Sequence, residues 1–325
     1  MTPPLADILA TARVVALPMH TRFRGVDVRE AVLFEGPQGW AEFSPFAEYD
    51  DAEAATWLAA AIDFAWHEQP APLRDRIPVN ATIPAVAAAA VADVLARFDG
   101  CRTAKVKVAE RGQVLADDVA RVRAVREAMG PEGRIRVDAN GGWNVDEAEH
   151  AVHALAECDL EYVEQPCATV PELAELRRRV KYMGIPVAAD ESVRRSADPL
   201  AVARAGAADL LVVKAQPLGG VRRALQIIAA TGLPAVVSSA LDTAVGLSQG
   251  AALAASLPEL DYDCGLGTAA LFLDDVADAR PSGGAVDARR VTPDAGALER
   301  LSASADRRDW WLARLSRCHE LVAAG

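Results

Sequence analysis

The chain is poor in the residues on which several kinds of functional site depend. Its five cysteines are scattered along 325 residues and none belongs to a Cys-x-x-Cys pair, so neither a disulfide framework nor a zinc site is indicated. The five histidines follow no ligand spacing, and no dinucleotide fingerprint or Walker-type phosphate loop is present. We therefore expect no nucleotide cofactor and a reducing, cytoplasmic environment.

Long apolar runs and an excess of positive charge are absent as well. No apolar run reaches the ~18–20 residues of a membrane span, and the first residues lack the basic end and apolar stretch of a secretory signal. The net charge of −12 argues against a nucleic-acid partner, which requires a basic face. With 51% hydrophobic and 25% charged residues, the composition is that of an ordinary globular protein. It leaves the choice between a monomer and a homo-oligomer open.

Eight short apolar segments alternate with helix-like sequence between about residue 78 and about residue 270. Their β-branched and apolar content suits parallel strands that are buried on both faces. Eight strand–helix units predict an α/β fold in the form of a closed barrel of TIM type. The predicted strands cover residues 78–83, 103–108, 135–140, 162–165, 187–191, 210–215, 235–240 and, with a weak pattern, 264–268.

The two ends of the chain do not follow this repeat. The first 77 residues predict strands and an Ala-rich helix, at 14–19, 26–35, 40–43 and 51–67. After about residue 280 the pattern predicts a short strand and then a helix near 306–323. We expect three parts: a small α+β capping domain at 1–77, a modified (β/α) barrel catalytic domain at 78–280, and a C-terminal return at 281–325 that packs on the cap.

Three acidic residues end successive predicted strands at equal spacing. Asp138, Glu164 and Asp190 are 26 residues apart (164 − 138 and 190 − 164), about the length of one strand–helix unit. Three carboxylates at the barrel mouth would repel one another, and a hard cation with oxygen ligands, such as Mg²⁺, removes that repulsion. One such acid alone would be read as a helix N-cap. Three at matched spacing predict a metal site, in which Mn²⁺ would satisfy the same oxygens.

Three lysines accompany these acids. Lys105 and Lys107 lie two residues apart on one predicted strand and therefore share a face, where crowding and desolvation favour a lysine base. Lys214 follows Asp190 by 24 residues (214 − 190) and ends the sixth strand, which lies opposite the second in a ring of eight. A lysine that only extends into water at a strand end is the alternative. Because the acids are present, we predict catalytic lysines on both sides of a substrate.

Further small or polar residues stand at the same strand ends. Asn140 follows the first acid by two residues and can orient a ligand, although it fits turn chemistry equally well. Ser238 and Ser239 end the seventh strand, and Gly265 and Gly267 lie in the eighth. Small residues leave room for a substrate and expose backbone N–H groups to a carboxylate. We predict that these five residues bind substrate, with ordinary turns as the alternative.

Together these motifs resemble those of the enolase superfamily, in the muconate-lactonizing-like branch that has lysines on both sides of its site. The resemblance covers nearly the whole chain. Within the superfamily, the short cap and the segments that begin at Arg24, Gly39 and Cys264 carry a closer resemblance, which implies Arg24 as a substrate-binding residue. The superfamily motifs are Lys105-x-Lys107, Asp138-Ala-Asn140, Glu164-Gln-Pro, Asp190-Glu-Ser and Lys214.

This resemblance implies a Mg²⁺-dependent lyase in which Asp138, Glu164 and Asp190 hold the metal. Lys107 would remove the proton α to a substrate carboxylate, and the metal would stabilise the resulting enediolate. Lys107 would then return the proton to the departing hydroxyl, while Lys214 stays as a fixed cation on the other face. The implied reaction converts 2-succinyl-6-hydroxy-2,4-cyclohexadiene-1-carboxylate to 2-succinylbenzoate and water in menaquinone biosynthesis.

Two alternatives remain open at this point. An N-acylamino acid racemase or dipeptide epimerase would use Lys107 and Lys214 as opposed bases, and one enzyme can combine both activities because both begin with the same proton abstraction. A non-catalytic barrel that keeps a cation for stability is the second alternative. It has no use for lysines on both faces of the site.

Overall fold

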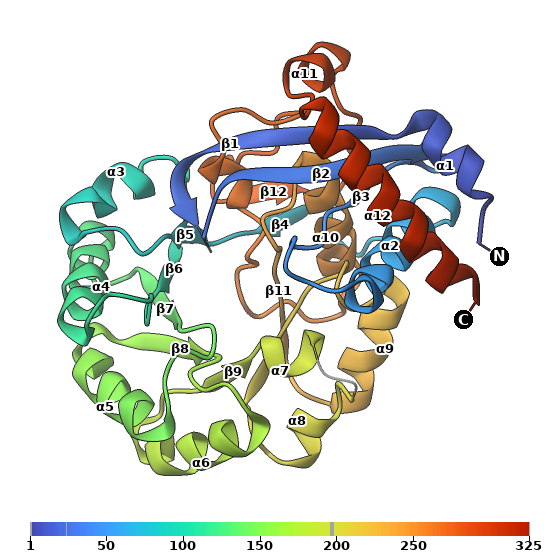
Figure 1. Cartoon of the computed structure of the whole chain (residues 1–325). Coiled ribbons are helices and arrows are strands. Elements are labelled where there is room, and N and C mark those ends of the chain that lie inside the picture. Colours follow the sequence, from blue (N-terminus) through green and yellow to red (C-terminus); the bar gives the residue numbers. More distant parts are fainter. Residues whose placement is uncertain (1, 24, 196–197, 325) are drawn as a thin grey trace.

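The computed structural model describes residues 2–23, 25–195 and 198–324 of the chain. In Figure 1 a ring of helices surrounds a set of short strands, and a small antiparallel sheet lies at one side of the ring. The α/β barrel and the α+β cap predicted from the sequence are therefore both present.

The cap contains a three-stranded antiparallel sheet with the strand order β1-β2-β3. Its strands are β1 (Arg13–Phe23), β2 (Val26–Gly36) and β3 (Gly39–Phe43). The tight turn into β3 places Gly39 at a φ of 114°, which residues with a Cβ rarely adopt. A short helix, α1 (Leu5–Thr11), precedes the sheet and was not predicted.

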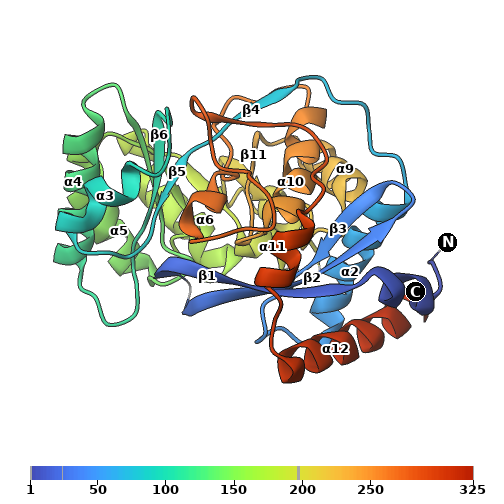
Figure 2. The same ribbon diagram turned by 90° about the horizontal axis from the view of Figure 1, so that it is seen from above.

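Two helices from opposite ends of the chain complete the cap. Trp57 of α2 (Asp51–Trp66) and Trp311 of α12 (Ala305–Ala324) are both buried in one apolar cluster. The Trp311 ring meets Phe43 of β3 edge-on, with ring centroids 6.0 Å apart. Figure 2 shows α12 running along the sheet beside α2. The C-terminal segment thus packs on the cap.

Seven strands form one parallel sheet in which every strand lies beside its neighbours in sequence. Each adjacent pair is parallel, and the apolar strand residues are almost completely buried, as expected for strands covered on both faces. The strands are β5 (Ala81–Ile83), β6 (Thr103–Lys107), β7 (Arg134–Asp138), β8 (Leu160–Glu164), β9 (Val187–Ala189), β10 (Leu210–Val213) and β11 (Ala235–Val237).

Helices connect these strands and form the outer ring seen in Figure 1. Two of them begin with capping boxes, in which Asn144 and Glu147, and likewise Thr169 and Glu172, satisfy each other's backbone N–H groups. The helix α4 (Leu115–Met129) ends before Gly130, whose φ of 71° suits a residue without a Cβ. The helices are α3 (Val91–Leu95), α4 (Leu115–Met129), α5 (Val145–Leu155), α6 (Val170–Val180), α7 (Glu191–Arg194), α8 (Ala201–Arg204), α9 (Val221–Thr231) and α10 (Ala244–Ser256).

Two bridge residues, instead of a full eighth strand, close the barrel. Cys264 pairs with Val79 and Gly265 pairs with Ser238 in isolated parallel bridges, and the chain then enters a 3₁₀-helix, η4 (Thr268–Leu271). The predicted strand at 264–268 is therefore wrong in its extent. A Cβ on Gly265 would lie 2.3 Å from the Ser238 hydroxyl oxygen, so the closure depends on a glycine at this position.

The predicted first strand also divides in two. β4 (Arg76–Pro78) pairs antiparallel with β12 (Ala285–Asp287), outside the barrel sheet, and β5 begins only at Ala81. Between them the Asn80 N–H donates to the Cys264 carbonyl at 2.9 Å. The Val79 N–H still donates to the Gly284 carbonyl at 2.9 Å, so the chain changes its hydrogen-bonding partner between Val79 and Asn80.

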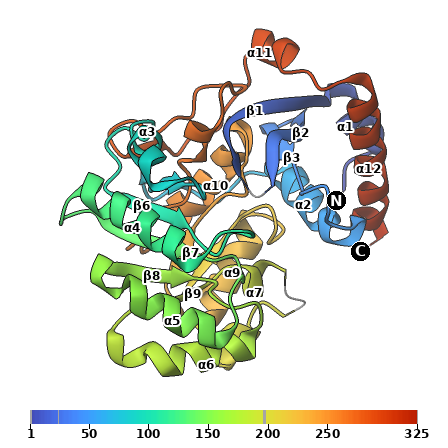
Figure 3. The same cartoon turned by 60° about the vertical axis from the view of Figure 1, so that its left-hand side comes forward.

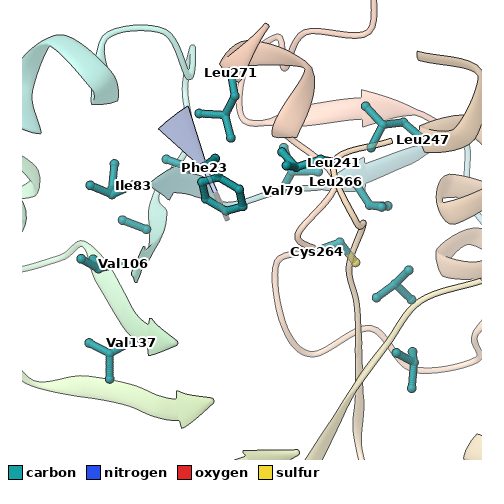
Figure 4. Close-up of a cluster of buried hydrophobic side chains, with 14 of the residues drawn as sticks. Phe23, Val79, Ile83, Val106, Val137, Leu241, Leu247, Cys264, Leu266 and Leu271 are labelled. Carbon is teal, nitrogen blue, oxygen red and sulfur yellow. The ribbon is translucent and has the colours of Figure 1, made fainter. Parts of the chain in front are cut away.

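One apolar cluster fills the space between the sheet and the helices and extends to the cap. Figure 4 shows Ile83, Val106 and Val137 on neighbouring strands of the barrel, with Phe23 from the end of β1 in the same cluster. Figure 3 shows the antiparallel sheet, α2 and α12 grouped on one side of the barrel. Phe23 therefore links cap and barrel.

Among the described residues, no helix combines the length and apolar character needed to cross a membrane.

Candidate active site

Five charged side chains meet at the carboxyl ends of five neighbouring strands. Lys107, Asp138 and Glu164 are the last residues of β6, β7 and β8, and Asp190 and Lys214 directly follow β9 and β10. All five are at most 8% exposed. Because parallel strands end on the same edge of a barrel, their even spacing in the sequence becomes proximity in space.

Left-handed backbone conformations turn the chain within two residues after β6, β7 and β8, and again in the loop that follows β11 (Ala235–Val237). Such conformations cost on the order of 1–3 kcal/mol for a residue with a side chain, and they persist where the surroundings fix them. The φ angles are 58° at Ala109, 47° at Asn140, 36° at Gln165 and 60° at Leu241. The Gln165 side-chain oxygen accepts hydrogen bonds from the backbone N–H groups of Asp190 and Ser192, at 2.9 and 3.2 Å. This turn therefore ties the end of β8 to the end of β9.

Two lysines of β6 contact the acids of the next two strands. Lys105 Nζ lies 2.9 Å from Glu164 Oε1 and 3.2 Å from Asp138 Oδ2. Lys107 Nζ lies 2.5 Å from the same Asp138 oxygen and donates a second hydrogen bond to Asn140 Oδ1 at 2.7 Å. These pairings offset the free-energy penalty of burying the charges.

Lys214 stands on the other side of the site. β6 and β10 are four strands apart in the sheet order, and the two bridge residues close the ring, so these strands face each other across the barrel. Lys214 Nζ donates to Asp190 Oδ2, and Lys107 and Lys214 line the same cavity together with Asp138 and Asp190. A bound carboxylic acid would therefore have an amine on each side.

Burial and charge act against each other in this cluster. At Asp138 burial is outweighed by the two β6 lysines, and the pKa of Asp138 is lowered. At Lys105 burial is outweighed by Glu164 and Asp138, and the pKa of Lys105 is raised. At Lys214 burial outweighs the attraction of Asp190, and the pKa of Lys214 is lowered. Burial, followed by repulsion from Asp138, raises the pKa of Glu164 to about 7, so the charge on Glu164 is poorly compensated.

The strand ends enclose a cavity of about 30 Å³. It adjoins a larger hollow of about 210 Å³, and Phe23, Lys107 and Asn140 line both. Glu164 lies behind Lys105, to which it is paired. Glu164 itself does not line the cavity. The predicted site residues that do line it are Lys105, Lys107, Asp138, Asn140, Asp190, Lys214, Ser238, Ser239 and Gly265.

Two predicted substrate-binding residues are not part of this lining. A Cβ on Gly267 would meet the Asn80 carbonyl oxygen at 2.9 Å and the Pro281 ring at 3.2 Å, so the glycine allows close packing at the barrel end. Arg24 lies outside the described residues. A part for either residue in substrate binding stays a prediction.

Comparison with known proteins assigns the family. The family models "Enolase N-terminal domain-like" and "Enolase C-terminal domain-like" match residues 14–65 and 85–293. Over 322 residues the chain is 56% identical to an o-succinylbenzoate synthase of Mycolicibacterium smegmatis, covering 98% of both chains. It is 57% identical over 322 residues to an o-succinylbenzoate synthase of Mycobacterium tuberculosis, covering 98% of this chain and 97% of that one. The chain belongs to the o-succinylbenzoate synthase family of the enolase superfamily.

The fold of this family member extends to more distant solved structures. The crystal structure of a muconate lactonizing enzyme from Pseudomonas fluorescens superposes with a TM-score of 0.75 at 19% identity, covering 90% of this chain and 98% of that chain. The barrel with its cap is therefore shared well beyond the range of close sequence similarity.

Enzymes of the enolase superfamily use a divalent metal, and three buried acids of this o-succinylbenzoate synthase family member have the ligand type that suits one. Asp138, Glu164 and Asp190 offer carboxylate oxygens, which hard cations prefer. Glu164 Oε2 is buried and has no hydrogen-bond partner among the described residues. As these side chains stand, the described part of the chain holds no group of three or more His, Cys, Asp or Glu arranged to bind an ion. The ammonium groups of Lys105 and Lys107 stand at the carboxylate oxygens instead.

Several cavity residues of the family member escaped prediction from the sequence. The Phe23 ring centroid lies 5.3 Å from Lys107 Nζ, and Thr82, Ala240, Leu241 and Thr268 complete the lining. The Ser239 hydroxyl lies 2.9 Å from Thr268 Oγ1, so it is engaged within the protein. Thr82 had a signal, because it is a polar residue inside an apolar strand. Thr268 also had a signal, because it ends the predicted strand at 264–268. Phe23 belongs to the cap, and the tertiary fold brings it to the site.

Proposed function

We propose that this enzyme dehydrates 2-succinyl-6-hydroxy-2,4-cyclohexadiene-1-carboxylate to 2-succinylbenzoate and water, as a lyase that breaks a carbon–oxygen bond in menaquinone biosynthesis. The observation that carries the proposal is the identity of 56–57% with o-succinylbenzoate synthases over 98% of the chain. The cavity supports it, since two lysines face each other there across buried carboxylates.

Lys107 is the proposed base. Its Nζ takes the proton α to the substrate carboxylate, and the electron pair of that C–H bond becomes part of the new ring double bond. The resulting ammonium donates to Asp138 Oδ2 and Asn140 Oδ1, the two acceptors that already lie 2.5 and 2.7 Å away. The ammonium then gives the proton to the departing hydroxyl, so that one group serves as base and acid.

Lys214 and Lys105 have the supporting roles in this proposal. Lys214 lies on the opposite side of the cavity and stabilises negative charge that develops on the substrate, as a fixed cation paired with Asp190. Lys105 sits behind Lys107 and pairs with Glu164 at 2.9 Å.

The metal, the substrate contacts and the compartment complete the proposal. A divalent ion held by Asp138, Glu164 and Asp190, which we propose to be Mg²⁺, would draw electron density from the substrate carboxylate and so acidify the adjacent C–H bond. Asn140, Ser238, Ser239 and Gly265 line the cavity and are proposed to contact the substrate. Five free cysteines suit the cytoplasm that we propose as its compartment.

A paired assay tests the proposal. The purified protein with Mg²⁺ is incubated with the cyclohexadiene substrate in one reaction and with N-succinyl amino acids in another. We expect rapid formation of 2-succinylbenzoate, loss of activity with a chelator, and recovery with added Mg²⁺. Absence of the aromatic product in the presence of Mg²⁺ would reject the proposed reaction.

Racemisation of N-acylamino acids is a second candidate function, favoured by the placement of the lysines. Lys107 and Lys214 lie on strands that face each other across the barrel, which suits two bases that exchange a proton on opposite faces of one carbon. The second arm of the assay decides this point. In D₂O, racemisation incorporates deuterium at the α-carbon of both enantiomers.

A further inference from the structure

A contact between the cap and the barrel lies close to the proposed base. Tyr49 stands in the loop between β3 and α2 and is 6% exposed. Its hydroxyl oxygen accepts a hydrogen bond at 3.0 Å from Nη1 of Arg194, the last residue of α7. The Arg194 side chain is 2% exposed, so the contact is made between two groups that are removed from solvent.

The other N–H groups of the Arg194 guanidinium donate hydrogen bonds to two acids of the barrel. Nε donates to Asp190 Oδ1 at 3.0 Å and Nη2 donates to Glu191 Oε1 at 2.6 Å. A guanidinium is planar and presents its donors in a rigid fork. A rotation of the Arg194 side chain therefore changes all of its contacts together, including the contact to Tyr49.

Glu191 connects Arg194 to the proposed base through hydrogen bonds with Asn140. Its Oε1 also accepts a hydrogen bond from Asn140 Nδ2 at 3.1 Å, and the other end of that amide, Asn140 Oδ1, accepts from Lys107 Nζ at 2.7 Å. Glu191 Oε2 is buried without a hydrogen-bond partner among the described residues. The position of the Glu191 carboxylate is thus set through a single oxygen, by Arg194 on one side and Asn140 on the other.

The position of the Asn140 amide depends on the groups that contact it. The Asn140 φ of 47° lies in the left-handed region, which asparagine adopts more readily than most residues with a side chain. Its backbone N–H donates to Asp138 Oδ1 at 3.0 Å, and its amide lies between Glu191 and Lys107. A shift of Glu191 therefore moves the acceptor that aims the Lys107 amino group.

We propose that Tyr49, Arg194 and Glu191 are positioning residues for the reaction. The Tyr49 hydroxyl fixes the Arg194 guanidinium, Arg194 fixes Glu191, and Glu191 acts through Asn140 on the Lys107 amino group. The inference rests on the proposed role of Lys107 as the base. Docking of the cap then tightens the catalytic geometry, although this contact brings no reacting group from the cap.

The test uses Tyr49→Phe, which removes one oxygen atom and keeps the ring packed against Phe46, 5.5 Å away edge-on. The matched control is Tyr182→Phe, because Tyr182 is 73% exposed and its hydroxyl contacts His153. Both variants are made in the full chain, compared by melting temperature, and assayed for kcat and KM with saturating Mg²⁺.

We expect Tyr49→Phe to lower kcat roughly 5-fold, the worth of about one hydrogen bond, with KM changed less than about twofold. Glu191→Gln should lower kcat roughly 10-fold or more, because a small misplacement of a reacting group is costly. Since both changes disrupt one network, the double variant should lose less than the product of the two effects. The control should match the wild type. Multiplicative losses, or a rise in KM with kcat unchanged, would overturn the proposal.

A second measurement separates failure of the positioning network from failure of the proposed function. In a crystal structure of Tyr49→Phe, we expect the Lys107 Nζ–Asn140 Oδ1 separation to exceed that of the wild-type crystal. An unchanged contact contradicts the positioning role, whatever reaction the enzyme catalyses. A wild type that forms no 2-succinylbenzoate, together with a lengthened contact in the variant, rejects the proposed function and leaves the positioning network supported.

Discussion

Replacing Glu164 with glutamine tests the electrostatics of the site without reliance on turnover. Glu164 is fully buried, its Oε1 accepts from Lys105 at 2.9 Å, and its Oε2 lacks a partner among the described residues. Burial, and after it the charge of Asp138, raise its pKa from 4.5 to about 7. At about 1.4 kcal/mol per pKa unit, this corresponds to at most about 3 kcal/mol against the charged form.

The sign of the pH effect follows from the direction of this shift. The pKa of Glu164 is higher in the folded than in the unfolded chain, so its contribution to stability is present below about pH 4.5 and is lost as the pH rises through about 7. At pH 8 without metal, the wild type therefore carries a buried charge that Glu164→Gln does not. Unfolding entropy for 325 residues is about 0.7 kcal/mol/K. The variant should thus melt up to about 4 °C higher in EDTA.

Added Mg²⁺ should reverse or cancel this difference. An ion at about 100 times its Kd stabilises the folded wild type by about 2.7 kcal/mol, which again corresponds to about 4 °C. The variant lacks one anionic ligand and should gain much less. Scanning calorimetry at pH 8, with EDTA or with MgCl₂, measures both effects. The surface substitution Glu157→Gln, at a side chain that is 58% exposed, is the control. A wild type whose melting temperature ignores Mg²⁺, or a variant that gains as much as the wild type, refutes this reasoning.

The other predictions concern the lysines and one buried acid. Lys107→Ala should lower kcat by at least roughly 10³-fold while the circular dichroism spectrum stays that of the wild type, because the base is lost; substantial residual turnover would contradict its role. Lys214→Met should leave more dehydration activity than Lys107→Ala. If the Lys214→Met variant still exchanges α-deuterium into both enantiomers of an N-succinyl amino acid, a second base at Lys214 is contradicted. Burial, and after it the charges of Glu42 and Asp274, outweigh the backbone hydrogen bonds from Ala244 and Val276 and raise the pKa of Asp275 from 3.8 to about 7. Its contribution to stability is therefore lost as the pH rises from about 4 through about 7. Asp275→Asn should therefore reduce the fall in melting temperature between pH 5 and pH 8 by a few degrees, and an unchanged slope would show that Asp275 does not titrate in this range.

The strand ends of the site were predictable because their signals are local. Asp138, Glu164 and Asp190 each close an apolar run, and parallel strands bring such ends to one edge without further information. The capping boxes at Asn144 and Thr169 are local features of the same kind, because each joins residues that are three positions apart. The residue roles and the domain boundaries stay predictions.

Features that depend on distant packing could not be predicted. The eighth strand is reduced to two bridge residues, at one of which Gly265 approaches Ser238 closely, and nothing in the local sequence around residue 265 shows that approach. The contact of Tyr49 with Arg194 joins residues that are 145 positions apart and belong to no shared motif. The cap residues that reach the site were therefore found only in the folded structure.

A crystal structure of the protein with Mg²⁺ and 2-succinylbenzoate tests the central claim most directly. The account predicts that Asp138, Glu164 and Asp190 all coordinate the ion, and that the amines of Lys107 and Lys214 lie on opposite faces of the bound product. An ion held elsewhere, or both amines on one face of the product, would contradict it.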